Sequence, residues 1–349
     1  MNGTLDLAEK LRAELPKEAF RPQPLRAWLA VPLVAVIVSC LYLLLTGRLA
    51  WYWALPVSLI LGNTYGTLGF LAHETLHGAV TKKRWVQNLI GYLAFAPYGF
   101  TPTLWRVWHN QVHHVHTNEP DIDPDSYGTL TRFQKVPLAK FQFKTGVGSG
   151  NFLTFFFFFY RFTYHAQIVL WVISKKYAKL FHALPRKRAI AESLLLFAFW
   201  IGLAVWAGPR GALFGVVIPI AVGNFILMSY IATNHFLRPL VDVDEPVDNS
   251  MSVTVPRVVD FLHLNFSHHV EHHYFPTMSA RFVPLVRKAI LKHAPDRYLA
   301  PPHWKAILWL YKTPRVYKDA QTLIDPYKHR EVPIPEVEHV LHDLTPHPV

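Results

Sequence analysis

The chain has 349 residues, a formal net charge of +12, 51% hydrophobic residues and a mean hydropathy of +0.17. This composition is too apolar for an ordinary soluble protein, and with 17% charged residues it is too polar to be membrane span throughout. A single cysteine, Cys40, excludes an intramolecular disulfide, a cysteine metal site and an iron–sulfur cluster. Lys and Arg retained on the cytoplasmic side of a membrane explain the positive charge better than nucleic-acid binding does.

The N-terminal part of the chain predicts a membrane hairpin. Residues 1–27 contain a short amphipathic stretch without the pattern of a secretory signal, so we expect an N-terminal cytoplasmic segment. Residues 28–46 and 51–72 are each apolar and long enough to cross a bilayer, and the short link between them makes them antiparallel. Small residues recur four positions apart on the second helix and favour close helix packing; they are Ser58, Gly62 and Gly66.

Three histidine clusters lie outside the apolar segments. They read H-E-T-L-H at the end of the second span, H-N-Q-V-H-H further on, and H-x-x-H-H within Asn265–Phe275. Residues three or four apart share one face of a helix, so each cluster can present convergent imidazoles, and His269 can meet both of its partners. Three such clusters in one chain predict a shared metal site built from His73, His77, His109, His113, His114, His269, His272 and His273.

Two apolar segments are predicted to lie in the membrane interface. Residues 85–98 are moderately apolar and too short for a span. Residues 152–173 are long enough to cross, but a crossing would put the third histidine cluster on the opposite side of the membrane from the first two. A single metal centre requires an even number of crossings, so we place 152–173 in the interface, with a re-entrant substrate wall as the alternative.

The C-terminal half predicts a second hairpin. Residues 189–207 and 211–233 are apolar, with a tight outer link between them, and basic runs at Lys82–Arg84 and Arg186–Arg188 mark the cytoplasmic side. The predicted organisation is therefore an all-α integral membrane protein with four transmembrane helices in two hairpins, interfacial helices and a cytoplasmic histidine-box cap. Both termini are predicted to lie in the cytoplasm. The predicted segments are an N-terminal cytoplasmic segment at 1–27, a membrane domain at 28–290, and a C-terminal cytoplasmic extension at 291–349 with a loosely ordered tail.

The donor set favours a redox metal. Imidazole suits iron, copper, zinc and nickel, but a structural zinc site stops at four ligands, whereas eight or nine histidines suffice for two metals. Nearby carboxylates can orient the rings or be plain solvated surface; the candidates are Glu74, Glu271 and Asp121. The acidic run after the second cluster is no calcium loop, because Ser126 and Arg132 replace the required Gly and Glu.

The remaining histidines divide into two groups. His116, His263 and His268 lie near the clusters, and a role at the metal or simple hydrogen bonding is open for each. The others are expected to be ordinary polar residues: His165, His182, His293, His303, His329, His339, His342 and His347.

The order H-x-x-x-H, H-x-x-x-H-H, H-x-x-H-H between two membrane hairpins resembles the integral-membrane fatty acid desaturase superfamily over roughly residues 50–290. The resemblance implies a non-haem di-iron centre, the eight box histidines as catalytic ligands, O₂ as co-substrate and a fatty acyl substrate in the membrane. It also implies a further ligand at the end of the last span, where this chain has His235. Some members carry an Asn four residues earlier, but this chain has Ile231 there, which leaves Asn265 as a candidate.

Three other functions share some of these features. A hydroxylase or carotenoid ketolase of the same superfamily would carry the same boxes, and the Asp-Pro-Asp after the second box is compatible with the ketolase branch. Asn234-His235-Phe236 and the length of the C-terminal region favour an acyl desaturase. A membrane metal transporter needs polar ligands at the midplane of its spans, which the predicted spans lack.

Desaturation consumes electrons that this sequence has no visible means of carrying. It has one cysteine, no Gly-rich dinucleotide fingerprint after a strand, and no haem-binding His-Pro-Gly-Gly. We therefore expect an external donor, a ferredoxin or small cytochrome with its reductase, steered to the basic cytoplasmic face. That face includes Lys82–Arg84, Arg186–Arg188, Arg281, Arg287 and Lys288.

Overall fold

The computed structural model describes residues 2–242 and 245–335, which fall into two compact units. Unit 1 comprises Met1–Phe20, His113–Phe157 and Tyr230–Val349, and unit 2 comprises Arg21–Val112 and Phe158–Ser229. Helices dominate both, and the described residues contain one small sheet, so the predicted all-α membrane fold is confirmed. The two units are compact parts of the fold, whereas the predicted segments 1–27, 28–290 and 291–349 separate the membrane domain from its cytoplasmic ends. The units therefore do not test the predicted segments.

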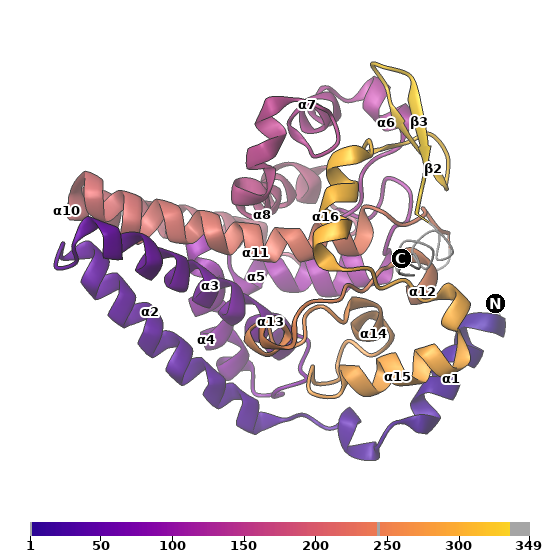
Figure 1. Cartoon of the computed structure of the whole chain (residues 1–349), viewed down its shortest axis with the longest axis horizontal. Helices are drawn as coiled ribbons and strands as arrows, with labels where there is room; N and C mark the ends of the chain where they lie inside the picture. Colours follow the sequence, from indigo (N-terminus) through magenta and orange to yellow (C-terminus); the bar gives the residue numbers. More distant parts are fainter. Residues whose placement is uncertain (1, 243–244, 336–349) are drawn as a thin grey trace, which may run out of the picture. The chain divides into compact units, whose positions relative to one another are not determined.

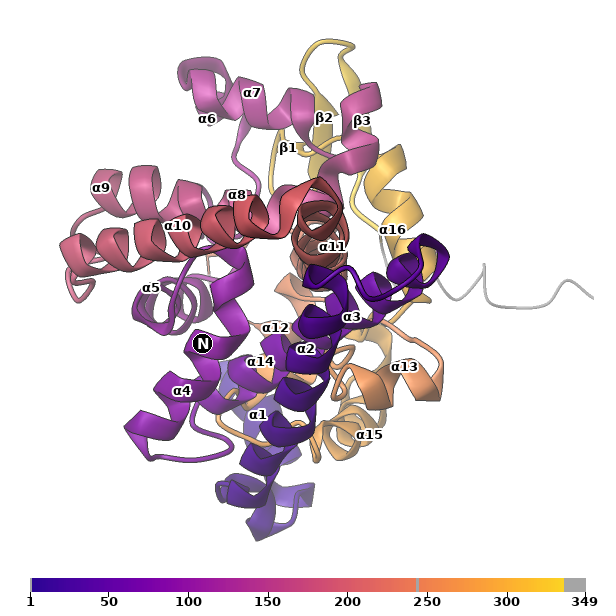
Figure 2. The ribbon, with the colours of Figure 1, turned by 90° about the vertical axis from the view of Figure 1, so that its left-hand side faces the viewer.

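The first predicted hairpin is present in unit 2. Helices α2 (Ala30–Leu45) and α3 (Trp51–Leu76) pack along each other, as Figure 2 shows, and the apolar helical run of the first begins at Pro24. Helix α3 continues four residues beyond the predicted end of its span. This extra turn carries His73 on the helix and places His77 at its C-cap.

The small-residue stripe on α3 packs against α11 (Ile218–His235). A Cβ added to Gly62 would lie 2.5 Å from Val222 Cβ and 2.7 Å from the Pro219 carbonyl oxygen, and one added to Gly66 would lie 2.8 Å from Ile226 Cγ2. The Ser58 hydroxyl donates to the backbone of both its own helix and Phe214, at 2.7 and 2.6 Å. The predicted role of these residues in close helix packing is confirmed.

The second hairpin appears as one apolar helical run, Arg186–His235, with a break where the outer link was predicted. Helix α10 (Arg186–Gly211) contains Gly208 at φ 69° and ψ 178°, followed by Pro209, and the π-helix Ala212–Val217 leads into α11. The predicted spans 189–207 and 211–233 lie on either side of Gly208. The end of α2 reaches the same place, because Leu45 contacts Gly211 and Gly215.

Both segments predicted to be interfacial are helical. Helix α4 (Arg84–Phe95) exposes Trp85 on one side and buries Ile90 on the other, as an amphipathic helix does. The run Phe152–Lys176, which includes α8 (Phe157–Ile168), meets the same length and hydropathy criteria as the other candidate spans, so its placement in the interface stays a prediction. In unit 2, α8 is fastened to α11 because Asn224 Oδ1 accepts from the Thr163 amide at 2.8 Å.

Unit 1 is built around the packing of the N-terminal helix on the region of the third histidine box. Helices α1 (Asn2–Glu14) and α15 (Val283–His293) lie side by side, as Figure 1 shows. The apolar side chains between them include Leu11, Val270 and Val286, all fully buried. The N-terminal segment therefore lies behind the helix that carries His269, His272 and His273.

The remaining elements of the described residues are short. In unit 1 the strands β1 (Val316–Tyr317), β2 (Thr322–Asp325) and β3 (Arg330–Pro333) form an antiparallel sheet, visible in Figure 2, with Leu323 opposite Tyr317 and Val332. The tail predicted to be loosely ordered falls largely outside the described residues, including His339, His342 and His347. The other helices are α5 (Pro102–Trp105), α6 (Leu130–Lys135), α7 (Pro137–Thr145), α9 (Ser174–Lys176), α12 (Pro246–Asn249), α13 (Arg257–Leu262), α14 (His269–Tyr274), α16 (His303–Lys312), the 3-10 helices Lys17–Phe20, Pro24–Leu29, Ala96–Tyr98, His113–Val115, Phe152–Phe156 and Pro295–Arg297, and the π-helices Arg106–Val112 and Val169–Ile173.

Candidate metal centre

Unit 2 brings together three of the predicted ligands. His73 and His77 lie at the end of α3, and His109 lies on the π-helix Arg106–Val112. The Nε2 atoms of His73 and His109 are 3.0 Å apart, and the ring centroids of His77 lie 4.7 Å from His73 and 5.3 Å from His109. Three imidazoles this close can ligate one metal ion, because each needs its nitrogen only about 2 Å from the ion.

Trp105 forms one wall of this group. Its ring stacks on His109 with centroids 4.5 Å apart and planes 26° apart, and it presents to His73 and His77 in edge contacts at 5.4 and 5.3 Å. The side chain is buried at 4% exposure, so it limits the orientations that the three imidazoles can adopt. Sequence reasoning missed Trp105, although its position four residues before His109 was a usable signal.

Unit 1 holds the other six predicted ligands. The ligand atoms of His113, His235 and His273 lie within 4.8 Å of one another, and all three side chains are buried. His235 is the last residue of α11, the place that the family resemblance indicated. His269 Nε2 lies 2.7 Å from His235 Nε2 and 3.0 Å from His273 Nε2.

The third box converges only in part as its spacing predicted. His269 and His273, four apart on α14, meet at their Nε2 atoms, but the ring centroids of His269 and His272 are 6.1 Å apart. His272 turns instead toward His114, with 3.2 Å between their Nε2 atoms. In the second box, His109 belongs to unit 2 and His113 and His114 to unit 1, so sequence proximity did not predict which histidines group within each unit.

The imidazoles of His272 and His273 are neutral at neutral pH. Burial, with the nearby His113 adding to it, lowers the pKa of His272 to about 3. Burial and the surrounding imidazoles hold the pKa of His273 well below its usual value. Only the neutral ring has a free lone pair for a metal, so these side chains are ready to bind at neutral pH.

Two carboxylates orient His113. Its Nδ1 lies 3.0 Å from Asp123 Oδ1 and 3.5 Å from Asp125 Oδ2, which keeps the proton on Nδ1 and directs Nε2 to a metal. The predicted candidate Asp121 is used differently: at φ 59° it accepts from the Thr129 amide and hydroxyl, at 3.1 and 2.8 Å. The acidic run was the right signal, but alternate residues of a tight loop point in different directions.

Comparison with known proteins identifies the family. The model of the fatty acid desaturase family matches residues 50–306, most of the chain. The chain belongs to the fatty acid desaturase family. It is 39% identical over 110 residues to the sn-1 oleoyl-lipid 12-desaturase of Picosynechococcus sp., a match spanning 31% of each chain, and 26% identical over 274 residues to the enzyme of that name from Synechocystis sp., spanning 74% of each. It is also 27% identical over 131 residues to the sn-1 acyl-lipid omega-3 desaturase (ferredoxin) of Nostoc sp., spanning 37% of this chain and 36% of the relative.

Asn118 fastens the second box of this desaturase-family chain to the end of α11. Its backbone is left-handed at φ 55°, and its amide nitrogen lies 3.2, 3.2 and 2.9 Å from the carbonyl oxygens of His235, Pro239 and Asn249. Its backbone N–H donates to Asp123 Oδ2 at 2.8 Å. Because Asp123 also orients His113, one short loop fixes ligands from two distant segments. Asn118 was not predicted from the sequence.

Glu271 fixes the helix of the third box. The carboxylate is fully buried and accepts from Arg287 Nε at 2.8 Å, from Tyr298 and from Ser252. Burial raises the pKa of Glu271, but the Arg287 charge and the other donors outweigh it and keep the pKa below its usual value. Ser252 Oγ also accepts from the amides of His269 and Val270, both at 3.0 Å, so the network holds the start of α14.

The other predicted candidates form hydrogen bonds with residues outside the histidine groups. Glu74 accepts from Arg26 at 2.8 Å, within unit 2. Asn265 donates its amide to the Ala280 carbonyl at 3.0 Å, an arrangement that uses its side chain in the loop before the box. His116 Nδ1 pairs with Glu119, His268 Nδ1 lies 3.0 Å from Ser267 Oγ, and His263 Nδ1 lies 2.9 Å from the Tyr230 hydroxyl.

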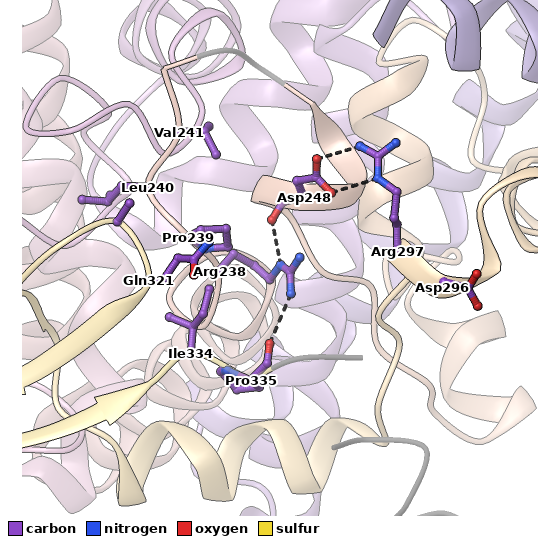
Figure 3. Close-up of a pocket in the computed structure, with 11 residues that line it drawn as sticks. Arg238, Pro239, Leu240, Val241, Asp248, Asp296, Arg297, Gln321, Ile334 and Pro335 are labelled. Carbon is purple, nitrogen blue, oxygen red and sulfur yellow. Dashed lines mark hydrogen bonds and ion pairs between the residues drawn. The ribbon is translucent and has the colours of Figure 1, made fainter. Parts of the chain in front are cut away.

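A pocket of about 520 Å³ in unit 1 is lined partly by the segment Arg238–Val241, which begins three residues after His235. Figure 3 shows Arg238 donating to the Asp248 carbonyl oxygen at 3.0 Å, while Arg297 binds the Asp248 carboxylate through two nitrogens at 3.1 and 2.6 Å. The two Arg and two Asp side chains that line the pocket, with Asp296 as the second acid, balance in charge. The bond from Arg238 to Asp248 joins the segment after His235 to α12.

Proposed function

We propose that this chain is an O₂-dependent desaturase that introduces a double bond into the acyl chain of a membrane glycerolipid. The observation that carries the proposal is the pair of histidine groups in a chain of the fatty acid desaturase family. The relatives named above are all acyl-lipid desaturases, which favours a lipid-bound acyl chain over acyl-CoA or a carrier protein.

We propose that the nine histidines of the two groups hold two irons. The donor set fits: every ligand is an imidazole, and burial lowers the pKa of His272 and His273 so that both rings are neutral at neutral pH. Bound iron would supply the redox chemistry with which O₂ can attack an unactivated C–H bond. The chain's own contribution is to fix the rings, through Asp123 and Asp125 at His113, Trp105 in unit 2 and the Glu271 network at α14.

The direct test is expression in a host of known lipid composition, followed by mass spectrometry of its lipids. We expect a new double bond in the acyl chains, which should be lost in His113→Ala and His272→Ala. It should be retained in His182→Ala, whose exposed ring lies 3.0 Å from the Lys179 carbonyl oxygen. A hydroxyl or keto product would instead establish the hydroxylase or ketolase alternative. About one zinc and no iron in fully active purified protein would refute the di-iron proposal.

We further propose an external electron donor. Removal of two hydrogens with full reduction of O₂ to two waters needs two more electrons and two protons. One relative's name specifies ferredoxin, which supports a small acidic donor. The exposed cations that could attract it include Lys82, Lys83, Arg281 and Lys288. Arg287 leaves this set, because it is paired with buried Glu271.

The donor proposal is tested with purified protein in detergent. Given substrate and O₂ alone, it should complete at most one turnover per site, and turnover with an added donor should slow as salt screens the encounter. Sustained catalysis with NAD(P)H and no added carrier would show that the chain holds a reductant site of its own.

The proposed topology has residues 74–188, residues 234–349 and both termini in the cytoplasm, with residues 152–173 not crossing. Single cysteines at Ser126 and Thr277, in a Cys40→Ala background, should react with a membrane-impermeant reagent from the same side, and a cysteine at Arg48 from the other. Labelling of Ser126 and Thr277 from opposite sides would mean that 152–173 crosses.

A further inference from the structure

Unit 1 exposes a set of large apolar side chains on two neighbouring helices. On α13, Val258 and Phe261 are 64% and 79% exposed, three residues apart and hence on one face. On α16, Trp304 and Leu308 are 60% and 45% exposed, four residues apart. We call these four side chains the α13–α16 apolar face.

The two helices are fastened to each other and to the end of α11. A backbone bridge joins Thr254 to Pro302, just before each helix. The Tyr230 hydroxyl lies 2.9 Å from His263 Nδ1, and the Tyr230 ring stacks on His303 with centroids 4.3 Å apart. The face is therefore held in place by packed, buried contacts.

This anchoring point lies near the end of the last apolar helical run. Tyr230 precedes by five residues the end of the apolar run Arg186–His235, the last candidate span. At 1.5 Å per residue, the anchor lies only about 7 Å along the helix from the end of that span. The end of a membrane span meets the boundary between hydrocarbon and lipid headgroups, so we expect the anchored helices to lie at that level.

We propose that the α13–α16 apolar face inserts into the interfacial layer of the bilayer as a membrane contact of unit 1, separate from the spans. Its chemistry fits a phospholipid surface, because it contains two exposed aromatic side chains, Phe261 and Trp304, each with a cation near it in sequence. Arg257 is exposed on α13, and Lys305 Nζ lies 5.7 Å from the centre of the Trp304 ring. Aromatic rings and snorkelling cations are the side chains enriched at this level. The proposal rests on the membrane character of the chain and is independent of the reaction it catalyses.

Spin labels measure this contact directly. Single cysteines at Phe261, Trp304 and, as a control, exposed Asp296 of the same unit are introduced into Cys40→Ala and labelled in the full chain in phospholipid nanodiscs. Collision rates with O₂, which concentrates in lipid, and with a nickel chelate, which stays in water, are compared. We expect the Phe261 and Trp304 labels to favour O₂ and the Asp296 label to favour the chelate.

Two results would overturn the proposal. A Phe261 label as accessible to the chelate as the Asp296 label would place the face in water. Poor access to both reagents, with spin–spin broadening that disappears on dilution with unlabelled protein, would show that a second copy of the chain covers it. As a second variant, Val258→Asp should shift the Trp304 label toward the chelate, whereas no shift would also contradict a shared insertion. None of these readouts depends on turnover.

Discussion

The contact between α3 and α11 can be tested with a single added methyl group, Gly62→Ala. The new Cβ would lie 2.5 Å from Val222 Cβ and 2.7 Å from the Pro219 carbonyl oxygen, where non-bonded carbon atoms need about 3.5–4.0 Å. Val222 is β-branched and cannot rotate away cheaply, and Pro219 presents backbone. The two helices must therefore separate locally.

We expect this separation to lower the free energy of unfolding by about 1–3 kcal/mol, the usual cost of overpacking a well-packed interface. Replacing a helical glycine by alanine also gains about 0.5–1 kcal/mol of backbone entropy, which offsets part of the loss. The measurement is equilibrium unfolding by titration of a denaturing detergent into mixed micelles, followed by circular dichroism.

The matched control is Gly202→Ala on α10. An added Cβ there meets no atom within 4 Å, so only the entropy gain of about 0.5–1 kcal/mol should remain. The two alanine variants should thus change stability in opposite directions. Equal stability of both variants would refute the claim that the stripe on α3 is a close-packing surface.

Three further predictions concern the residues that hold the box histidines. Asp123→Asn should weaken iron binding about 10–100-fold, because His113 loses the charged carboxylate nearest to its Nδ1. Asp121→Asn should leave the metal content unchanged, because Asp121 binds Thr129 instead. Elemental analysis after dialysis against a chelator measures the difference. Asn118→Ala should cost about 1–3 kcal/mol in detergent unfolding because three carbonyls lose their donor, and an Asp at this position should fail to restore it because a carboxylate cannot donate. Arg287→Met should destabilise the protein by about 3–5 kcal/mol at neutral pH by leaving the Glu271 charge buried and unpaired. The lowered pKa of Glu271 makes its contribution to wild-type stability present at neutral pH and lost on acidification through that pKa, so the gap between wild type and variant should narrow as the pH falls.

The sequence predicted the features that depend on short-range patterns. A run of about 20 apolar residues is itself the requirement for crossing a bilayer, so the helices around 28–46, 51–72, 189–207 and 211–233 could be found without tertiary information. The link between the last two was placed correctly because Gly208-Pro209 interrupts an otherwise continuous helix. Histidine spacing within a single turn was similarly reliable for His269 and His273.

The residues that orient the histidines could not be read in the same way. Asp123 lies ten positions from His113, and Asn118 reaches carbonyls more than a hundred positions away. Neither separation corresponds to a helical or strand period, so no pattern in the sequence links the partners. Trp105 is the exception, because it stacks on His109 four residues later and that spacing could have indicated it, although the segment between them, Arg106–Val112, is a π-helix.

Substitutions outside the histidine boxes should therefore also disturb the histidines. A box histidine supplies one ligand atom, but its position is set by a carboxylate, an amide or a helix cap elsewhere in the unit. Ser252 illustrates this, because its single hydroxyl group binds two amides at the start of α14 and also the buried Glu271 carboxylate. Loss of that hydroxyl would leave two buried N–H donors and one carboxylate acceptor without this partner, and would loosen His269 although no histidine had been substituted. The residues that position the histidine group of unit 1 therefore include more than the boxes themselves, and extend from His113 and Asn118 to Arg287.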